Sequence, residues 1–302
     1  MNVRKAVIPA AGLGTRLLPI SKVVPKELLP LVDRPMLHYI VEEALDAGIT
    51  KIIIVTSEAK KSIADYFDPA PHLEAMLKER GEYFSEAAMR RVRTEAEFTF
   101  VQQNEQLGLG HAVYTARHAV GDEAFAVLLP DDIIDSPTPV TGQLLETAQH
   151  YNASVVAVEE VPTEHITGYG VIKPMDVADG IYRVLGMVEK PSAQDAPSNL
   201  GIVGRYILTP EIFEAVSRIS TGVKGELQLT DGIELLMAKQ KVYARKFQGI
   251  RPDGPDLGIR GGSDAFHRPI SGARRQRIFL NTVMHNSLYF VRDRSMCVGS
   301  AL

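Results

Sequence analysis

Two glycines and an arginine form the first group of residues that could do chemistry. Gly12, Gly14 and Arg16 follow the apolar run at residues 5–9, which reads as a short buried strand. A glycine-rich turn after a strand presents backbone N–H groups to a phosphate, and the N-terminus of a following helix adds partial positive charge. Arg16 adds a forked donor for phosphate oxygens. On these residues alone, a phosphate-binding turn and an ordinary tight turn with a surface arginine are equally open.

A second cation follows shortly after this turn. Lys26 lies between Pro25 and Pro30, and prolines keep a segment irregular because they lack a backbone N–H. We therefore expect Arg16 and Lys26 in one loop-like region, where they could neutralise charge that develops on a triphosphate. The pattern is not a dinucleotide fingerprint, because the third glycine of G-x-G-x-x-G would fall at Leu17, and it is not a P-loop.

Carboxylates mark the end of another apolar run. Residues 124–129 read as a buried strand, and Asp131, Asp132 and Asp135 follow it. Open α/β sheets bind ligands at the carboxyl ends of their strands, which is where this group lies, although acidic residues at a strand end are, taken alone, more often solvated charges. Solvated loop charges would explain Asp132 and Asp135 equally well. We assign no catalytic role to His111, because one histidine at the expected start of a helix is more often structural.

The elements that must position these residues alternate along the chain. Apolar spacing favours a Rossmann-like α/β fold, with a mostly parallel mixed sheet and helices on both faces. The expected strands cover residues 5–9, 51–56, 98–102, 124–129, 154–159, 170–173, 183–189 and 202–208. The expected helices cover residues 35–47, 60–66, 110–119, 210–217 and 230–239, with a helical insertion at 73–94.

Whole-chain composition excludes several classes of protein. The chain has 302 residues, of which 45% are hydrophobic and 23% charged, and its formal net charge of −4 predicts no nucleic-acid surface. The single cysteine, Cys297, excludes a disulfide framework and fits a reducing, cytoplasmic compartment. No apolar run is long enough for a membrane span, and the apolar start is too short for a secretory signal.

Several motifs together resemble one enzyme family. Residues 11–19 (AGLGTRLLP) and 25–35 (PKELLPLVDRP) are similar to the signature of bacterial UTP-glucose-1-phosphate uridylyltransferases, a branch of the sugar nucleotidyltransferases. The resemblance implies transfer of UMP from UTP to glucose 1-phosphate, which yields UDP-glucose and pyrophosphate. It further implies that the UDP-glucose serves surface polysaccharide biosynthesis and galactose metabolism. It covers roughly residues 3–250, with further similar segments at 103–112, 128–135, 169–171, 188–191, 198–206 and 225–231.

The resemblance also implies roles for individual residues. An Mg²⁺ cofactor is implied, with Asp131 as its ligand. Gln103 would hydrogen-bond the uracil edge, because an amide both donates and accepts. Glu189 would accept from glucose hydroxyls, and Lys190 would contact the phosphate. The implied residues are, for catalysis, Arg16, Lys26 and Lys190; for the nucleotide, Ala11, Gly12, Gly14, Thr15, Glu27, Gln103 and Gly108; and for the sugar phosphate, Gly170, Glu189, Lys190 and Asn199.

The C-terminal part departs from this family. The family usually continues with a Tyr-Asp-Cys-Gly element, whereas this chain has Arg-Pro-Asp-Gly at 251–254, and the match ends beyond residue 258. Asp253 is a candidate counterpart of the family's aspartate, and whether it is a second metal ligand is open. We expect a catalytic domain at 1–255 and a separate segment at 256–302, of natural or frame-shifted origin. The resemblance implies a homo-oligomer, a dimer or tetramer.

Two kinds of rival function remain open. Thymine and uracil share the edge that Gln103 would read, so a thymidylyltransferase, or a transferase for another sugar 1-phosphate, fits the same motifs. A non-catalytic nucleotide-binding homologue is compatible with the altered tail, although Arg16, Lys26, Asp131 and Lys190 are all present. The expected partners are UTP and glucose 1-phosphate, and neither a nucleic acid nor a membrane.

Overall fold

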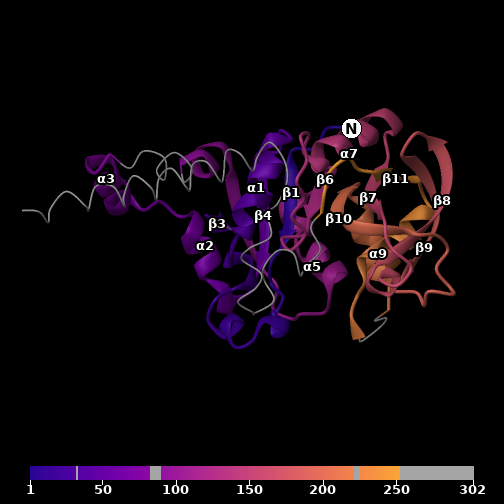
Figure 1. Cartoon of the computed structure of the whole chain (residues 1–302), viewed down its shortest axis with the longest axis horizontal. Coiled ribbons are helices and arrows are strands. Elements are labelled where there is room, and N and C mark those ends of the chain that lie inside the picture. The colour runs from indigo at the N-terminus through magenta and orange to yellow at the C-terminus, as the bar shows by residue number, and fades with distance from the viewer. Residues whose placement is uncertain (32, 82–89, 221–224, 252–302) are drawn as a thin grey trace, which may run out of the picture. The chain divides into compact units, whose positions relative to one another are not determined.

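The described part of the chain forms a unit that ends at Ile250. A computed structural model describes residues 1–31, 33–81, 90–220 and 225–251, and every element named below belongs to the unit Met1–Ile250 (Figure 1). The predicted segment at 256–302 and the predicted boundary at residue 255 lie outside the described residues. None of the helices described here has the length and apolar character needed to cross a bilayer.

A mixed sheet runs through this unit. Within the described residues it has nine strands in the order β5-β4-β1-β6-β10-β7-β11-β9-β8 (Figure 1). The strands are β1 (Lys5–Pro9), β4 (Lys51–Thr56), β5 (Glu97–Gln102), β6 (Phe125–Leu128), β7 (Ser154–Glu160), β8 (Gly170–Ala178), β9 (Ile181–Glu189), β10 (Leu200–Leu208) and β11 (Val242–Lys246). Every predicted strand is therefore present.

Parallel pairing dominates the N-terminal half of the sheet. β1 pairs in parallel with β4 and β6, and β4 pairs in parallel with β5. β4 is buried at every position after Lys51, as its continuous run of β-branched residues predicts for a strand covered on both faces. Because these four strands are parallel, their carboxyl ends meet at one edge. In the other half, β10 runs antiparallel to β6 and β7, and β8 and β9 form an antiparallel hairpin.

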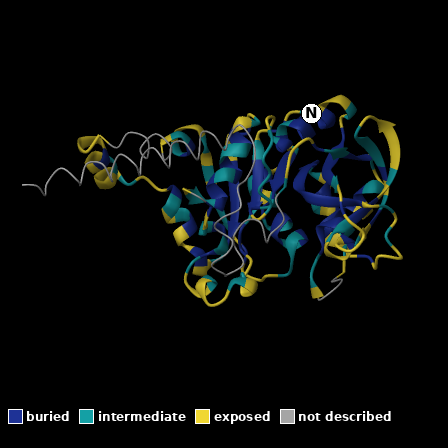
Figure 2. Cartoon of the chain, in the orientation of Figure 1, coloured by how far each residue is buried: buried dark blue, intermediate teal, exposed yellow. Residues whose placement is uncertain are grey.

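Apolar side chains form a separate core on each face of the sheet. Adjacent residues of β1 alternate between them, since Ala6 and Ile8 join one core and Val7 joins the other. The first core includes α1 (Met36–Asp46), α2 (Ser62–Phe67) and α7 (Val140–Tyr151), and the second includes α5 (Leu109–Thr115), α8 (Glu211–Arg218) and α9 (Leu229–Met237). Figure 2 shows the buried strands between helices that are partly exposed. The predicted α/β fold, with helices on both faces, is confirmed.

One predicted helix is divided. The helix expected at 110–119 forms as α5 and α6 (Arg117–Val120). The hydroxyl of Thr115 donates to the carbonyl of His111 at 2.8 Å, and such a back-bond from a threonine bends helices. The single-helix prediction is therefore wrong at its centre, although both ends are helical.

Other elements differ in extent or lack a sequence signal. The predicted helical insertion at 73–94 contains α3 (Pro71–Glu79) and a helical turn at 90–95, while residues 82–89 lie outside the described part. The sequence patterns do not predict α7, because Gly142 lies in its first turn and weakens the helical signal. They do not predict β11 either, because this short strand ends in two charged residues.

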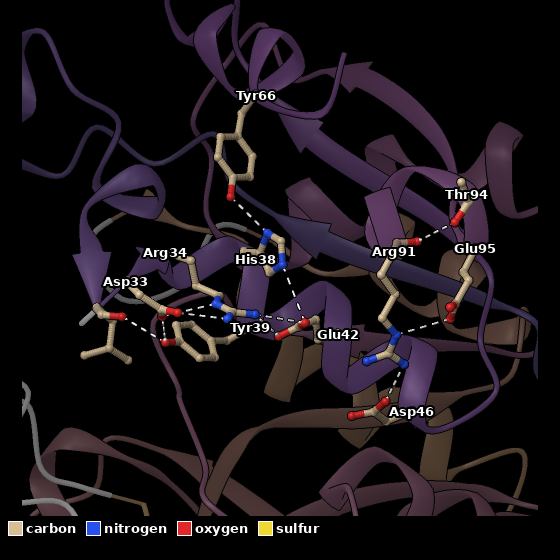
Figure 3. A network of polar contacts seen from close by, with 11 residues as sticks. Asp33, Arg34, His38, Tyr39, Glu42, Asp46, Tyr66, Arg91, Thr94 and Glu95 are labelled. Atoms are coloured by element: carbon tan, nitrogen blue, oxygen red, sulfur yellow. Dashed lines mark hydrogen bonds and ion pairs between the residues drawn. The ribbon is translucent and has the colours of Figure 1, made fainter. Parts of the chain in front are cut away.

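A short hairpin fastens the segment that carries Lys26 to α1. It consists of β2 (Pro30–Leu31) and β3 (Arg34–Pro35). Arg34 donates to Glu42 of α1 at 3.1 Å and to Asp33 at 2.9 Å (Figure 3). Nδ1 of His38 in α1 lies 2.9 Å from the hydroxyl of Tyr66 in α2. These contacts fix the chain between the glycine-rich loop and α1.

Candidate functional site

The glycine-rich loop follows β1 and folds back on itself. Gly14 has a φ of 64°, and its carbonyl accepts from the hydroxyl of Ser21 at 2.8 Å. A Cβ at Gly14 would lie 3.3 Å from Cβ of Ser21 and 3.5 Å from Cβ of Lys26, so a glycine permits this close approach. The other loop residues predicted to act on the nucleotide are Ala11, which is buried, and Gly12, Thr15 and Arg16, which are exposed.

The prediction that a helix N-terminus adds partial positive charge at this loop is wrong. The chain continues from the loop through three single-turn 3₁₀ helices, η1 (Thr15–Leu17), η2 (Ile20–Lys22) and η3 (Lys26–Leu28), and α1 begins only at Met36. Pro19 and Pro25 lie between these turns and cannot supply the N–H groups of a continuous helix. An anion at this loop would therefore have to be held by backbone amides and cationic side chains rather than by a helix dipole.

Lys26 and Asp131, which were assigned separate roles, form an ion pair. Nζ of Lys26 lies 2.8 Å from Oδ2 of Asp131, across 105 positions of sequence. Burial lowers the pKa of Lys26, but the charge and hydrogen bond of Asp131 outweigh it and raise that pKa. Burial also raises the pKa of Asp131, and the charge of Lys26 outweighs it and lowers that pKa. Both groups are thus charged, and the Asp131 side chain, 57% exposed, is accessible to a ligand.

A buried ion pair lies beneath the loop. Nζ of Lys60 donates to both carboxylate oxygens of Glu27, at 3.0 and 2.8 Å, and to the carbonyl of Ala10 at 2.8 Å. Glu27 is only 1% exposed. The arrangement favours a supporting role for Glu27, in which it holds Lys60 against the start of the loop. A direct contact between Glu27 and a nucleotide stays a prediction.

A buried arginine braces the loop that carries Asp131. Arg205 on β10 is 0% exposed. Its Nη1 donates to the carbonyl of Leu129 at 3.2 Å, and its Nη2 donates to the carbonyl of Asp132 at 2.7 Å. Nη2 also pairs with Glu43 of α1 at 2.8 Å. Since the two carbonyls flank Asp131, Arg205 fixes the backbone on both sides of that carboxylate.

Asp132 has a side-chain contact, whereas Asp135 is held through its backbone. Oδ2 of Asp132 accepts from the backbone N–H of Gly204 at 2.9 Å. A Cβ at Gly204 would lie only 2.4 Å from that oxygen, so the close contact depends on the glycine. The backbone of Asp135 exchanges hydrogen bonds of 2.9 and 2.8 Å with Ile250. Both residues therefore hold the loop after β6 to other elements.

Gln103 follows β5 at the same edge of the sheet. Its backbone N–H donates to the carbonyl of Thr56 at 2.8 Å, and its side chain is 4% exposed. Nε2 of Gln103 lies 2.8 Å from Nδ1 of His111, the histidine to which no catalytic role was assigned. The predicted base-reading residue thus has a fixed position, and His111 has a structural contact with it.

The glycines after Gln103 pack against the segment before α9. Gly108 has a φ of 99°, and a Cβ there would lie 2.9 Å from the carbonyl oxygen of Leu227. The N–H of Gly110 donates to the same carbonyl at 2.8 Å, and the N–H of Leu227 donates to Leu107 at 2.7 Å. This backbone contact joins two of the segments that resemble the family.

The residues predicted to bind a sugar phosphate gather at the ends of β8 and β9. Gly170 and Glu189 are direct partners in the sheet, and Oε2 of Glu189 accepts from the hydroxyl of Thr230 at 2.9 Å. Nζ of Lys190 lies 2.8 Å from Oε1 of Glu189. Lys190 has a φ of 48°, an uncommon value for a residue with a side chain. Asn199, exposed just before β10, is the remaining predicted sugar residue, and its carbonyl accepts from Val161.

Strand β10 lies beside both groups of predicted site residues. It pairs with β6, which Asp131 follows, and with β8 at Gly201, opposite Val171. Gly170, the partner of Glu189, is the residue before Val171. The predicted nucleotide and sugar sides accordingly lie near one strand.

Sequence reasoning missed the residues that support this site. Lys60 and Glu43 make their contacts with partners far away in sequence, so no local pattern marks them. Arg205 lies in the segment 198–206 that was recognised as similar to the family, but no role was assigned to it. Thr230 lies in the segment 225–231 that was recognised as similar to the family, and that similarity was the one signal for it.

The donor set is compatible with a divalent cation that is held mainly by substrate. No group of three or more His, Cys, Asp or Glu side chains is arranged to hold a metal within the residues that the structure describes. Mg²⁺ commonly takes one or two protein carboxylates and completes its shell with phosphate oxygens and water. One accessible carboxylate, Asp131, fits that mode, and Asp253 lies outside the described residues.

Comparisons with known proteins identified a matching family and similar proteins. Residues 5–251 match the family described as "Nucleotidyl transferase". A UTP–glucose-1-phosphate uridylyltransferase of Bacillus subtilis (strain 168) is 48% identical over 259 residues, which are 85% of this chain and 89% of that protein.

Solved structures of similar sequence have the same fold. A UDP-glucose pyrophosphorylase complexed with UDP-glucose is 42% identical with a TM-score of 0.77, over 83% of this chain and 93% of that one. A UTP-bound UGPase from Acinetobacter baumannii is 36% identical with a TM-score of 0.80, over 94% of this chain and 99% of that one.

Proposed function

This chain belongs to the nucleotidyl transferase family, and we propose that it transfers UMP from UTP to glucose 1-phosphate, which forms UDP-glucose and releases pyrophosphate. Relatives 48% identical over 85% of the chain carry the name of that activity. One structural observation supports it above the others. Asp131 follows β6, and Glu189 pairs with Gly170 at the start of β8; β6 and β8 both pair with β10, which supports a site that holds a donor and an acceptor phosphate next to each other.

In the proposed reaction, the chain needs to position two phosphates rather than supply a base. A phosphate oxygen of glucose 1-phosphate attacks the α-phosphorus of UTP, a new P–O bond forms, and the bond to the β-phosphate breaks. The nucleophile is already anionic, so no proton has to be removed. We assign charge neutralisation to Arg16 and Lys26 on the UTP phosphates and to Lys190 on the sugar phosphate.

Asp131 is the residue that would hold Mg²⁺ in this proposal. The bound ion would neutralise phosphate charge and orient phosphate oxygens. The ion pair of Asp131 with Lys26 keeps the carboxylate ionised, as a metal ligand must be. Arg205 holds the backbone on both sides of it. Residues of this chain thus prepare the carboxylate before a metal arrives.

The choice of base rests on Gln103 in this proposal. A fixed amide accepts from N3–H of uracil and donates to a neighbouring carbonyl. Thymine presents the same edge, so dTTP is the nearest rival substrate. The cytoplasmic location, the role in polysaccharide biosynthesis and the homo-oligomeric state, a dimer or tetramer, stay predictions from the sequence.

Pyrophosphate release by the purified chain tests the proposal. The assay supplies glucose 1-phosphate with UTP, dTTP, ATP, CTP or GTP, each with Mg²⁺ and each with a chelator. We expect rapid release with UTP and Mg²⁺ and loss of release with the chelator. Release with dTTP in preference to UTP would replace the uridylyltransferase by a thymidylyltransferase. If no nucleotide gave pyrophosphate release, the result would favour the non-catalytic alternative.

Gly170→Ala is expected to weaken sugar-phosphate binding without affecting UTP. A Cβ at this position would lie 2.8 Å from Cγ2 of Thr230 and 3.1 Å from Oε2 of Glu189, so both side chains must shift. We expect the KM for glucose 1-phosphate to rise by about tenfold, since displacement of Glu189 would weaken its hydrogen bond to the sugar, and hydrogen bonds to charged groups contribute about 1.5–3 kcal/mol. Steady-state kinetics with each substrate varied in turn measure this. An equal rise in the KM for UTP would contradict the assignment of Gly170 to the sugar side.

A further inference from the structure

Lys60 joins the two ends of the segment 10–27, which contains the glycine-rich loop and Lys26. It is the last residue of η4 (Glu58–Lys60), a single turn that follows β4. Its Nζ donates to the carbonyl of Ala10, where the segment begins, at 2.8 Å. The same Nζ donates to both carboxylate oxygens of Glu27, where the segment ends, at 3.0 and 2.8 Å. These hydrogen bonds, which we call the Lys60 bridge, close the segment at its base.

Packing does not fix the middle of this segment. None of residues 12–24, all of which the structure describes, is buried. Leu18 is 59% exposed and Val23 is 79% exposed, so these apolar side chains add little packing energy. Segments with few buried apolar contacts open locally at a low free energy. The arrangement of the loop therefore depends on the bridge at its base.

Both charges of the Lys60 bridge are held away from water. Burial raises the pKa of Glu27, and the opposing charges of Lys60 and Lys26 do not fully offset it. Burial lowers the pKa of Lys60, and the charge of Glu27 does not fully offset it. Buried ion pairs of this kind add little net stability. The bridge therefore contributes mainly a fixed geometry, in which Glu27 and its neighbour Lys26 are held against the start of the loop.

We infer that Lys60 is a positioning residue, which holds Lys26 and the loop amides in one arrangement for the phosphates of UTP. The inference rests on the proposed function, in which the loop binds UTP and Lys26 neutralises phosphate charge. The Lys60 side chain is only 10% exposed, and its three N–H donors have partners within the chain, so it acts through Glu27 and Ala10. Because phosphate transfer here depends on positioning, loss of the bridge lowers the rate of the reaction.

A substitution that removes the ammonium group tests this inference. Lys60→Met removes the charge and keeps most of the side-chain volume. The matched control is Lys5→Met, because Nζ of Lys5 also joins a carbonyl, that of Val120 at 2.7 Å, to a carboxylate, that of Glu123 at 2.9 Å. The Lys5 side chain is 14% exposed and lies at the amino end of β1, away from the loop. For each full-length variant, kcat, both KM values, the Tm and hydrogen exchange are measured.

We expect kcat to fall by about 10- to 100-fold in Lys60→Met, because a small misplacement of catalytic groups has an effect of this size. The KM for glucose 1-phosphate is expected to stay at the wild-type value, and the amides of residues 10–31 are expected to exchange faster. Lys5→Met is expected to keep the wild-type kcat and the wild-type exchange in this segment. Wild-type exchange or wild-type kcat in Lys60→Met, or an equal fall of kcat in Lys5→Met, would overturn the inference.

A second variant guards against loss of folding, since Lys60→Met leaves the Glu27 carboxyl buried without its partner. Lys60→Met/Glu27→Met replaces both partners by apolar side chains, which buried ion pairs often tolerate without loss of stability. Its readout is hydrogen exchange, because Glu27 is itself predicted to act on the nucleotide. Faster exchange confined to residues 10–31 would support the inference, and wild-type exchange, or faster exchange throughout the chain, would overturn it.

Hydrogen exchange also separates this inference from the proposed function, because it requires no turnover. A wild-type chain that does not use UTP would overturn the proposed function. The exchange of residues 10–31 in the two variants would still decide whether the Lys60 bridge holds the loop.

Discussion

Lys26→Ala is expected to lower kcat by about 10²–10³-fold and to leave the free energy of unfolding nearly unchanged. A preorganised cation beside developing phosphate charge contributes that much to a transition state. The ion pair of Lys26 with Asp131 has partners that are 24% and 57% exposed, and exposed ion pairs contribute about 0–1 kcal/mol to folding. Steady-state kinetics and denaturant unfolding of the same preparation measure both quantities.

The matched control for Lys26 is a lysine in an ion pair elsewhere. Nζ of Lys246, the last residue of β11, lies 2.6 Å from Glu160, the last residue of β7, and both side chains are exposed. Lys246→Ala is expected to leave kcat at the wild-type value. A kcat within about threefold of wild type in Lys26→Ala would refute the catalytic assignment. Asp131→Asn is the companion variant, and its loss of Mn²⁺ binding, followed by electron paramagnetic resonance, would separate a metal ligand from a simple partner of Lys26.

Local sequence patterns could predict most of the sheet. β1 and β4 are continuous apolar runs, and strands buried on both faces have this composition wherever they occur. α7 and β11 follow no such pattern, because the conformation of α7 depends on packing against β7 and β10, and that of β11 depends on pairing with β7 and β9. The division between α5 and α6 coincides with a bond from one threonine hydroxyl, a detail that periodicity does not contain.

The candidate site, like the fold, has residues that the sequence could predict and contacts that it could not. Arg16, Lys26, Gln103 and Glu189 lie in short segments whose residue types state their chemistry, so the sequence could nominate them. The contacts that hold such residues in place join distant parts of the chain. Lys60 and Glu27 are 33 positions apart, and the Arg205 contact with α1 spans 162. Only the fold brings these partners together, so no local motif could have predicted them.

The Arg205–Glu43 pair is expected to be the most sensitive point for folding. All the polar nitrogens of Arg205 donate, to Glu43 and to the carbonyls of Leu129, Asp132 and Gly204. Removal of one partner of a buried ion pair leaves the other charge uncompensated, which costs about 3–5 kcal/mol. Arg205→Met is therefore expected to lower the free energy of unfolding by that amount in urea denaturation. Arg218→Ala, which removes an exposed pair with Glu214, is the control and is expected to change it by about 0.5 kcal/mol or less.

The pH dependence of unfolding distinguishes loss of the ion pair from a simple loss of volume. Burial raises the pKa of Glu43, but the charge and hydrogen bonds of Arg205 outweigh it, and the pKa lies below its ordinary value of 4.5. A lowered pKa in the folded state means that the stabilisation is complete above pH 4.5 and is lost as the pH falls toward the folded-state value. In wild type, loss of this stabilisation steepens the fall in the free energy of unfolding as the pH drops below 4.5. Glu43→Gln has no carboxylate to titrate, so this part of the pH dependence is expected to be absent. A different result would contradict this account: Arg205→Met is destabilised, but the free energy of unfolding of Glu43→Gln falls below pH 4.5 in parallel with that of wild type. Arg205 would then stabilise the fold through packing and its hydrogen bonds to carbonyls, and the charge of the ion pair would contribute nothing.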